Sequence, residues 1–176
     1  MTIKRLTPKD CTQNLLEHFE RYQEVKKCWR KENGAWKLKD ISFIEQWDTT
    51  EKSEIIDEFI DCLQNGGVVL GAFKENQLIG FSSIINEQFG TQKEYIQLAT
   101  LYVSAKNRNS GLGRKLFAQS CLEAVKLGGK KLYISAHSSE ETQAFYKLMG
   151  CRETQEINKE LFEKEPYDCH LEYSLL

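Results

Sequence analysis

Hydrophobic positions near the start of the chain follow two different spacings. Thr2 to Leu6 alternates in the manner of a strand. Thr7 followed by Pro8 is typical of a helix start, with threonine as the cap and proline at the first helical position. Apolar residues then recur every three or four positions, which predicts one helix or two ending at Asn33-Gly34: Cys11, Leu15, Phe19, Tyr22, Val25 and Trp29.

The next segment, Trp36 to Trp47, is aromatic without clear periodicity and is interpreted as irregular. Asp48 and Glu51 are three residues apart and predict a capping box. The helix that should follow carries its apolar residues on one face and ends at Asn65-Gly66-Gly67: Ile55, Ile56, Phe59, Ile60 and Leu63.

A pair of strands and a third, irregular strand follow. Val68 to Lys74 and Gln77 to Ile85 predict a hairpin turning at Glu75-Asn76. In Tyr95 to Val103 the apolar alternation changes phase at Ala99-Thr100. Such a change indicates either a β-bulge or a strand buried on both faces.

Strands and helices interleave in the rest of the chain. The predicted order is a helix over 111–127, a strand over 131–136, a helix over 138–149 with a Ser138–Glu141 capping box, and two strands over 151–156 and 168–175. This order predicts an α/β (α+β) fold with a mixed sheet covered by helices.

Composition limits the classes of protein that need to be considered. A chain of 176 residues with 40% hydrophobic residues predicts a single domain over 1–176. A net charge of −2 argues against nucleic-acid binding. The longest apolar stretch, Val68 to Phe73, is too short to cross a membrane, and no signal peptide is recognisable, so we expect a cytoplasmic protein.

The six cysteines are widely spaced and form no CxxC pair. This pattern favours reduced thiols, most of them buried, and predicts no metal site. Cys169 and His170 are adjacent, and neighbouring residues on a strand point to opposite faces. A joint catalytic or metal-binding role for these two is therefore not expected.

The segment Arg108-Asn109-Ser110-Gly111-Leu112-Gly113-Arg114 lies between the irregular strand and its helix. Glycines allow close backbone approach, and the free amides of a helix N-terminus favour a phosphate. The spacing fits neither nucleotide motif, because Leu116 replaces the third glycine of a dinucleotide fingerprint and no Walker sequence is present. The alternative is an ordinary strand-to-helix turn.

Two motifs together carry a resemblance to a known family. Arg108-x-x-Gly111-x-Gly113 follows a strand, and Phe145-Tyr146-x-x-x-Gly150 comes later in the chain. This combination resembles the GNAT superfamily of acetyl-CoA-dependent N-acetyltransferases. The resemblance implies a mostly antiparallel twisted sheet of six to seven strands, helices on both faces, a bulged and splayed central strand, and acetyl-CoA as co-substrate without a metal.

The resemblance also implies roles for individual residues. The coenzyme diphosphate would be bound by Arg108 and the amides of Asn109, Ser110, Gly111, Leu112, Gly113 and Arg114. The pantetheine arm would pair with the backbone of Leu101, Tyr102 and Val103. Ser139 stands where the family often has a cofactor-contacting asparagine. Tyr146 would protonate the departing thiolate, the alternative being a purely packing aromatic.

The general base is left open by the sequence. Some family members carry a glutamate where this chain has Gln97, and an amide is not a base. Glu94 and His137 are candidates, and the remaining possibility is a water chain near Gln97 with no essential base. Cys151 replaces a frequent phenylalanine and has no evident base beside it, which disfavours an acyl-enzyme.

The acceptor side carries weaker signals. Four aromatic residues could form a pocket or cation–π site for an amine, or simply pack: Trp29, Trp36, Phe43 and Trp47. The following helix is acidic through Glu51, Glu54, Asp57, Glu58 and Asp61, which fits either attraction of a cation or a solvated face.

We therefore expect acetyl transfer from acetyl-CoA to a primary amine by direct attack in a ternary complex. The preferred acceptor class is a small-molecule amine, with a protein lysine or N-terminus as an alternative. A non-catalytic acyl-CoA-binding sensor or interaction module is the rival from another functional class. Monomer and homodimer both stay open.

Overall fold

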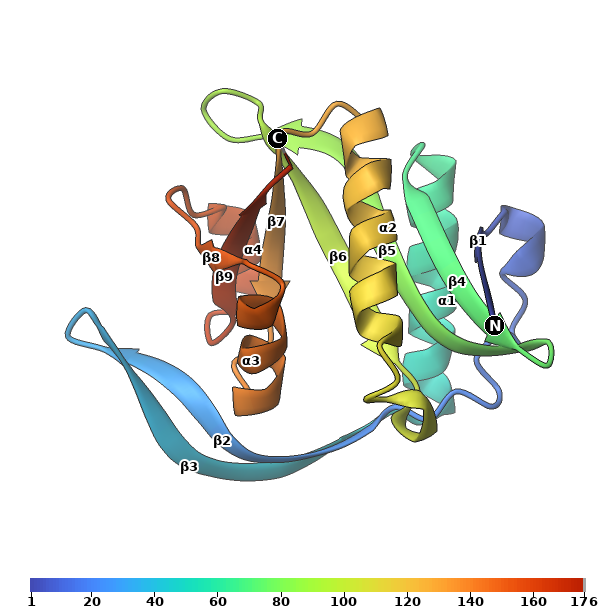
Figure 1. Ribbon diagram of the computed structural model, residues 1–176, viewed down its shortest axis with the longest axis horizontal. Coiled ribbons are helices and arrows are strands. Elements are labelled where there is room, and N and C mark those ends of the chain that lie inside the picture. The colour runs from blue at the N-terminus through green and yellow to red at the C-terminus, as the bar shows by residue number, and fades with distance from the viewer. Residues whose placement is uncertain (176) are drawn as a thin grey trace.

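A seven-stranded sheet organises the protein, whose computed structural model describes residues 1–175. The strand order is β1-β4-β5-β6-β7-β9-β8, and only β6 and β7 run parallel (Figure 1). Its strands are β1 (Thr2–Arg5), β4 (Val68–Lys74), β5 (Gln77–Phe89), β6 (Tyr95–Val103), β7 (Lys131–Ala136), β8 (Arg152–Glu153) and β9 (Cys169–Ser174). The predicted mixed, mostly antiparallel sheet is confirmed.

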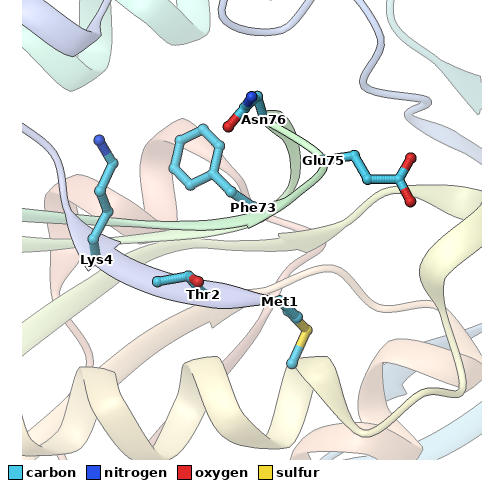
Figure 2. Close-up of a pocket in the computed structure, with 6 residues that line it drawn as sticks. All are labelled: Met1, Thr2, Lys4, Phe73, Glu75 and Asn76. Atoms are coloured by element: carbon cyan, nitrogen blue, oxygen red, sulfur yellow. The ribbon is translucent and has the colours of Figure 1, made fainter.

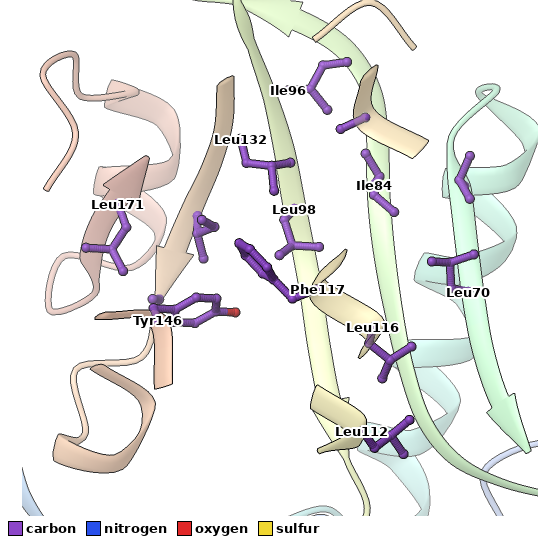
Figure 3. Close-up of a cluster of buried hydrophobic side chains, with 14 of the residues drawn as sticks. Leu70, Ile84, Ile96, Leu98, Leu112, Leu116, Phe117, Leu132, Tyr146 and Leu171 are labelled. Carbon is purple, nitrogen blue, oxygen red and sulfur yellow. The ribbon is translucent and has the colours of Figure 1, made fainter. Parts of the chain in front are cut away.

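Helices cover both faces of this sheet. The four are α1 (Thr49–Gln64), α2 (Leu112–Lys126), α3 (Glu140–Leu148) and α4 (Lys159–Lys164). Adjacent residues of β4 point to opposite faces of the sheet: Leu70 packs in a core with Leu116 of α2, whereas Val69 packs in a core with Ile56 of α1. Figure 3 shows the first of these cores, which we call the α2 core; the second is the α1 core.

The predicted N-terminal helix is wrong. Only one turn of 3₁₀ helix forms, at Pro8–Asp10, and the chain then builds a long hairpin from β2 (Tyr22–Glu32) and β3 (Ala35–Gln46). The register shifts between Val25 and Lys27, where Ile41 and Ser42 of β3 lie opposite Lys26 alone, so the extra residue is in β3. Val25 and Cys28 of β2 are both buried although three residues apart, and this spacing imitates that of a helix. The segment interpreted as irregular is β3.

The β2–β3 hairpin lies across the end of the main sheet, beside α3 (Figure 1). The Trp29 amide donates a 2.8 Å hydrogen bond to the carbonyl of Ser138, and Cys28 forms a β-bridge with Ser139. The hairpin is therefore attached to the segment that follows β7 and continues the protein surface there.

Several predicted boundaries change. The Asp48–Glu51 capping box of α1 is confirmed, but α3 is capped by Ser139 rather than Ser138. Strand β5 continues to Phe89, and the predicted 151–156 strand shrinks to Arg152–Glu153. Helix α4, which begins after Asn158, was not predicted.

The phase change in β6 is a β-bulge. Ser83 of β5 lies opposite Thr100 and Ile84 lies opposite Leu98, so Ala99 is an extra residue. Beyond it, Leu101 returns to the α2 core that also contains Leu98. The next residue, Tyr102, joins the α1 core on the opposite face. The bulge interpretation is therefore confirmed.

All six cysteines are free thiols, and four are buried: Cys11, Cys28, Cys62 and Cys169. Among residues 1–175, no three His, Cys, Asp or Glu side chains are grouped closely enough to hold a metal ion. Within the same range, no helix has the length and apolar character needed to cross a membrane.

Candidate functional site

The central feature is the point where β6 and β7 part. Their parallel pairing extends only from Tyr95–Lys131 to Gln97–Tyr133. Beyond these residues the two strands diverge, with α2 and α3 beside the widening space between the ribbons (Figure 1). Past Gln97, β6 pairs with β5 alone, and its other edge has no strand partner within residues 1–175.

A loop rich in free amides follows β6. After a 3₁₀ turn at Ala105–Asn107 the backbone adopts positive φ at Asn109 (59°) and at Gly111 (79°), which caps α2. Within residues 1–175, none of the six consecutive amides from 109 to 114 donates a hydrogen bond. Free amides at a helix N-terminus attract anions through partial charge and the helix dipole.

The two loop glycines have different surroundings. A Cβ built on Gly111 would meet no atom within 4 Å, whereas one on Gly113 would lie 3.1 Å from the Phe145 ring of α3. Gly111 therefore faces open space, and Gly113 allows α2 to approach α3.

Arg108 is half-buried at the base of this loop. Its Nε donates to the Val103 carbonyl at 3.2 Å. Burial lowers the pKa of Arg108, and the nearby positive charge of Arg21 lowers it further. Arg114, in the first turn of α2, is exposed. The loop thus combines free amides with one fixed and one solvent-exposed guanidinium.

Tyr146 extends from α3 into the α2 core. Its ring lies 6.4 Å from that of Phe117, and Figure 3 shows its hydroxyl end directed toward the β6 side. No group among residues 1–175 hydrogen-bonds this hydroxyl. Burial raises the pKa of Tyr146, and the proximity of Tyr102 and Cys151 raises it further. The residue therefore packs and also presents an unused O–H donor.

Ser139 is fully occupied by structural contacts. It is buried, its Oγ accepts from the Thr142 amide at 3.3 Å, and Gln23 donates to the same atom at 3.3 Å. These contacts fix the start of α3 against β2.

The proposed bases are already engaged. Glu94 pairs with Lys131 at 3.0 Å beside the start of β6. His137 accepts the Ser139 amide at Nδ1 and places Nε2 3.7 Å from Glu45. The half-buried Gln97 side chain makes no hydrogen bond within the described range 1–175. Both candidate bases therefore already have a charged or polar partner in the structure.

The four aromatic residues of the predicted acceptor wall make packing contacts. Trp29 packs against the α2 core, and Phe43 lies 5.6 Å from the His137 ring. Trp36 receives the cation of Lys31, while Trp47 stacks on Phe19 and Phe81. The five acidic side chains of α1 are exposed: Glu51, Glu54, Asp57, Glu58 and Asp61.

Sequence reasoning missed Arg21, at the start of β2. Its guanidinium is buried between Tyr102 and Trp47, with ring distances of 5.0 and 5.8 Å. No spacing or motif marked it, because its burial depends on contacts with residues far along the chain.

A hollow of about 460 Å³ lies elsewhere, at the β1 edge of the sheet (Figure 2). It is lined by Met1, Thr2, Lys4, Phe73, Glu75 and Asn76. Lys4 lies over the Phe73 ring at 5.2 Å. Strands β4 and β5 separate this hollow from β6. It contributes nothing to the site between β6 and β7.

Comparison with known sequences identifies the family. The sequence model of the acetyltransferase (GNAT) family matches residues 22–151, which is most of the chain. The chain belongs to the GNAT acetyltransferase family. A comparison with curated protein sequences finds no significant match.

Solved structures share the fold over nearly the whole chain. Nourseothricin acetyltransferase is 12% identical, with a TM-score of 0.71 and coverage of 99% of this chain and 98% of that one. A putative streptothricin acetyltransferase from Bacillus anthracis str. Ames, in complex with acetyl coenzyme A, is 15% identical, with a TM-score of 0.72 and coverage of 98% and 97%.

An aminoglycoside 6'-N-acetyltransferase complexed with coenzyme A is 15% identical, with a TM-score of 0.60 and coverage of 100% of this chain and 98% of that one. At these identities the likeness establishes the fold of this GNAT chain.

Proposed function

We propose that this single-domain GNAT protein transfers an acetyl group from acetyl-CoA to a primary amine, by direct attack in a ternary complex. The observation that carries the proposal is the run of six unused amides, 109–114, beside the point where β6 and β7 part. An anion site and an open strand edge at one place suit a long co-substrate that has a diphosphate and an amide-containing arm.

The loop would hold the diphosphate. The amides from Asn109 to Arg114 supply donors, Gly111 leaves space for an anion to approach, and Arg108 and Arg114 add positive charge. Ser139 in this proposal acts by fixing the start of α3, since its hydroxyl already caps that helix.

The backbone of Leu101, Tyr102 and Val103 would bind the pantetheine arm as an added strand. These residues pair with β5 on one side only. The Ala99 bulge and the end of β6–β7 pairing lie just before them, so the arm would enter the widening between the two strands. The thioester supplies the acyl group.

Tyr146 would act on the leaving thiolate. Its O–H has no partner within residues 1–175 and its raised pKa keeps it protonated across the physiological range. It can therefore donate to the sulfur as negative charge develops there. For the amine, we propose that a water held by Gln97 passes the proton to solvent, since Glu94 and His137 are engaged.

The acceptor is proposed to be a small-molecule amine. The similar structures include acetyltransferases named for nourseothricin, streptothricin and aminoglycosides, all of them small molecules. Six free thiols suit a reducing cytoplasm. A monomer is sufficient for this mechanism, because every proposed residue comes from one chain.

Release of free thiol from acetyl-CoA tests the proposal. The protein is mixed with acetyl-CoA and a panel of amines, amino acids, polyamines, aminoglycosides and peptides, and thiol is followed with a chromogenic disulfide. Amine-dependent release supports the transferase. Tight coenzyme A binding by calorimetry with no release for any amine would favour the acyl-CoA-binding module instead.

A further inference from the structure

Arg21 is a buried cation without an anionic partner. The residue is 7% exposed. Its Nη1 donates to Gln23 at 3.2 Å, while Nε is enclosed and has no hydrogen-bond partner. No carboxylate among residues 1–175 forms an ion pair with it. Arginine stays charged in proteins, so its positive charge is left uncompensated by any anion.

Aromatic contacts compensate only part of this charge. The guanidinium lies 5.0 Å from the centre of the Tyr102 ring and 5.8 Å from that of Trp47. Cation–π attraction is weaker than the cost of burying an ion without a counterion. By contrast, the partly exposed Arg5 and Arg152 each pair with a carboxylate, Glu123 and Glu172. Arg21 therefore lacks a negatively charged ligand.

The face of the sheet on which Arg21 lies indicates where its anionic ligand would bind. Tyr102 and Trp47 pack in the α1 core, while Leu101 and Val103 pack in the α2 core. Arg21 is near enough to Arg108, at the base of the diphosphate loop, for the two positive charges to repel each other. The Tyr102 ring that Arg21 contacts nevertheless lies on the α1-core face of β6, whereas that loop caps α2. The missing anion is accordingly on the acceptor side.

Negative groups surround the same region. Glu45 faces His137, and Asp168 accepts from Ser135 at 2.8 Å. Burial raises the pKa of Tyr102, and both carboxylates, together with that of Glu58 on α1, raise it further through their charge, whereas Arg21 lowers it. A buried cation with carboxylates in the same region matches a ligand that carries both an ammonium and an anionic group.

We propose that Arg21 binds a carboxylate of the acceptor, so that the preferred substrates are amino acids or other amines bearing a carboxylate. Glu45 and Asp168 would attract the ammonium end of the same molecule. This inference rests on the acetyltransferase function proposed above and narrows its substrate class. It predicts that purely cationic amines are poor acceptors for this protein.

Matched acceptor pairs test the inference. Glycine, 4-aminobutyrate and L-lysine are each compared with the corresponding carboxamide, which keeps the amine and removes the negative charge. Thiol release gives kcat/KM for each, corrected for the fraction of free amine. We expect at least one carboxylate member to exceed its carboxamide by about 100-fold, since a polar site rejects ligands that leave its charge unpaired.

Variants assign this preference to the guanidinium. Arg21→Gln should reduce the ratio to near one, and Arg21→Lys should retain part of it. Arg30→Gln is the matched control, because Arg30 lies on β2, the strand that follows Arg21, but bonds Ser138 and covers the Tyr167 ring. It should keep the wild-type ratio.

A stability measurement separates binding from structural support. Removing an unpaired buried charge should leave the melting temperature of Arg21→Gln unchanged or higher, and coenzyme A affinity should stay within threefold. A lower melting temperature with an unchanged carboxylate ratio would overturn the inference and make Arg21 a packing residue.

The two proposals fail in different ways. Thiol release with equal kcat/KM for every carboxylate and carboxamide overturns the role of Arg21 and leaves the transferase proposal standing. No release with any acceptor overturns both. If release occurs and Arg21→Gln is poorly folded by circular dichroism, the Arg21→Lys ratio decides: a reduced ratio supports recognition by Arg21, and an unchanged ratio opposes it.

Discussion

The loop glycines allow the diphosphate site to be tested separately from protein stability. Judged by sequence alone, Gly111 and Gly113 are equivalent members of one motif. In the structure, Gly111 has a φ of 79° and no atom lies within 4 Å of the position that an added methyl group would take, whereas a methyl on Gly113 would press on Phe145 at 3.1 Å. The two substitutions by alanine should therefore have different consequences.

Gly111→Ala places an ordinary residue in the left-handed region. This costs about 1–2 kcal/mol. At about 2–4 °C per kcal/mol for a chain of this size, the melting temperature should fall by about 2–8 °C. The methyl also enters the space proposed for the diphosphate, so coenzyme A affinity should fall by about tenfold or more. Gly111→Asn should lose less stability, because asparagine tolerates this conformation, and should lose similar affinity.

Gly34 provides a matched control. It lies in the β2–β3 turn with the same φ of 79° and no atom within 4 Å of its Cβ position. Gly34→Ala should lower the melting temperature to a similar extent without changing coenzyme A affinity. Affinity is measured by calorimetry well below the melting temperature of each variant. An affinity within threefold of wild type in Gly111→Ala would refute the diphosphate assignment.

Gly113→Ala should behave differently. Its helical φ gives alanine an advantage of about 0.5–1 kcal/mol, set against the movement that Phe145 must make. Stability should change by less than about 1 kcal/mol. Since Phe145 is adjacent to Tyr146, the turnover number should fall more than cofactor affinity does. The opposite order, with affinity lost first, would contradict this account of α2–α3 packing.

Three further predictions concern catalysis and stability. Tyr146→Phe should lower kcat by about 10²–10⁴-fold with little change in coenzyme A affinity, and a kcat within threefold of wild type would make Tyr146 a packing residue. Glu94→Gln and His137→Ala should keep a rate that rises from pH 6 to 10 with the free amine, whereas loss of a titrating limb with a ~10²-fold drop would identify a dedicated base. Burial raises the pKa of Cys62 and Cys121 from 9.0 to about 11, and of Cys151 and Cys169 to about 12. Because these folded-state pKa values exceed the unfolded value, urea midpoints should be constant below pH 8 and fall progressively above pH 9; a midpoint unchanged at pH 10.5 would contradict the burial of these thiols.

Local signals make the C-terminal half predictable. The α2 boundaries follow from Gly111 at one end and Gly128-Gly129 at the other, and β7 is a short apolar run between turns. The Ala99 bulge is visible in the sequence because one extra residue inverts the hydrophobic alternation of a strand. In each case the determining residues are neighbours in the sequence.

The errors arise where structure depends on distant contacts. Pairing with β3 makes Tyr22–Glu32 a strand, yet its buried residues Val25 and Cys28 are three positions apart, as on one face of a helix. Ser139 rather than Ser138 caps α3, since Arg30 of β2 donates to the Ser138 hydroxyl at 2.7 Å. A capping pattern read from one helix cannot include a partner supplied by another strand.

The candidate site likewise has one part that local sequence predicts and one part that depends on distant contacts. Its amide loop is encoded by consecutive residues and is predictable from them. Arg21 is invisible in the sequence because an arginine in a polar stretch is normally exposed. Only the approach of Trp47 and Tyr102, residues 26 and 81 positions away in the sequence, encloses its guanidinium.

The Ala99 bulge also explains why one strand can serve two ligands. In a regular strand Leu98 and Leu101, three residues apart, would point to opposite faces. The extra residue brings both into the α2 core and sends Tyr102 to the α1 core. The backbone after the bulge therefore lies beside the amide loop, while the Tyr102 ring lies beside Arg21 on the other face. Without the bulge, Tyr102 would turn toward the α2 side and Arg21 would lose one of its two aromatic contacts. A single inserted residue thus sets both the proposed cofactor edge and the proposed acceptor contact.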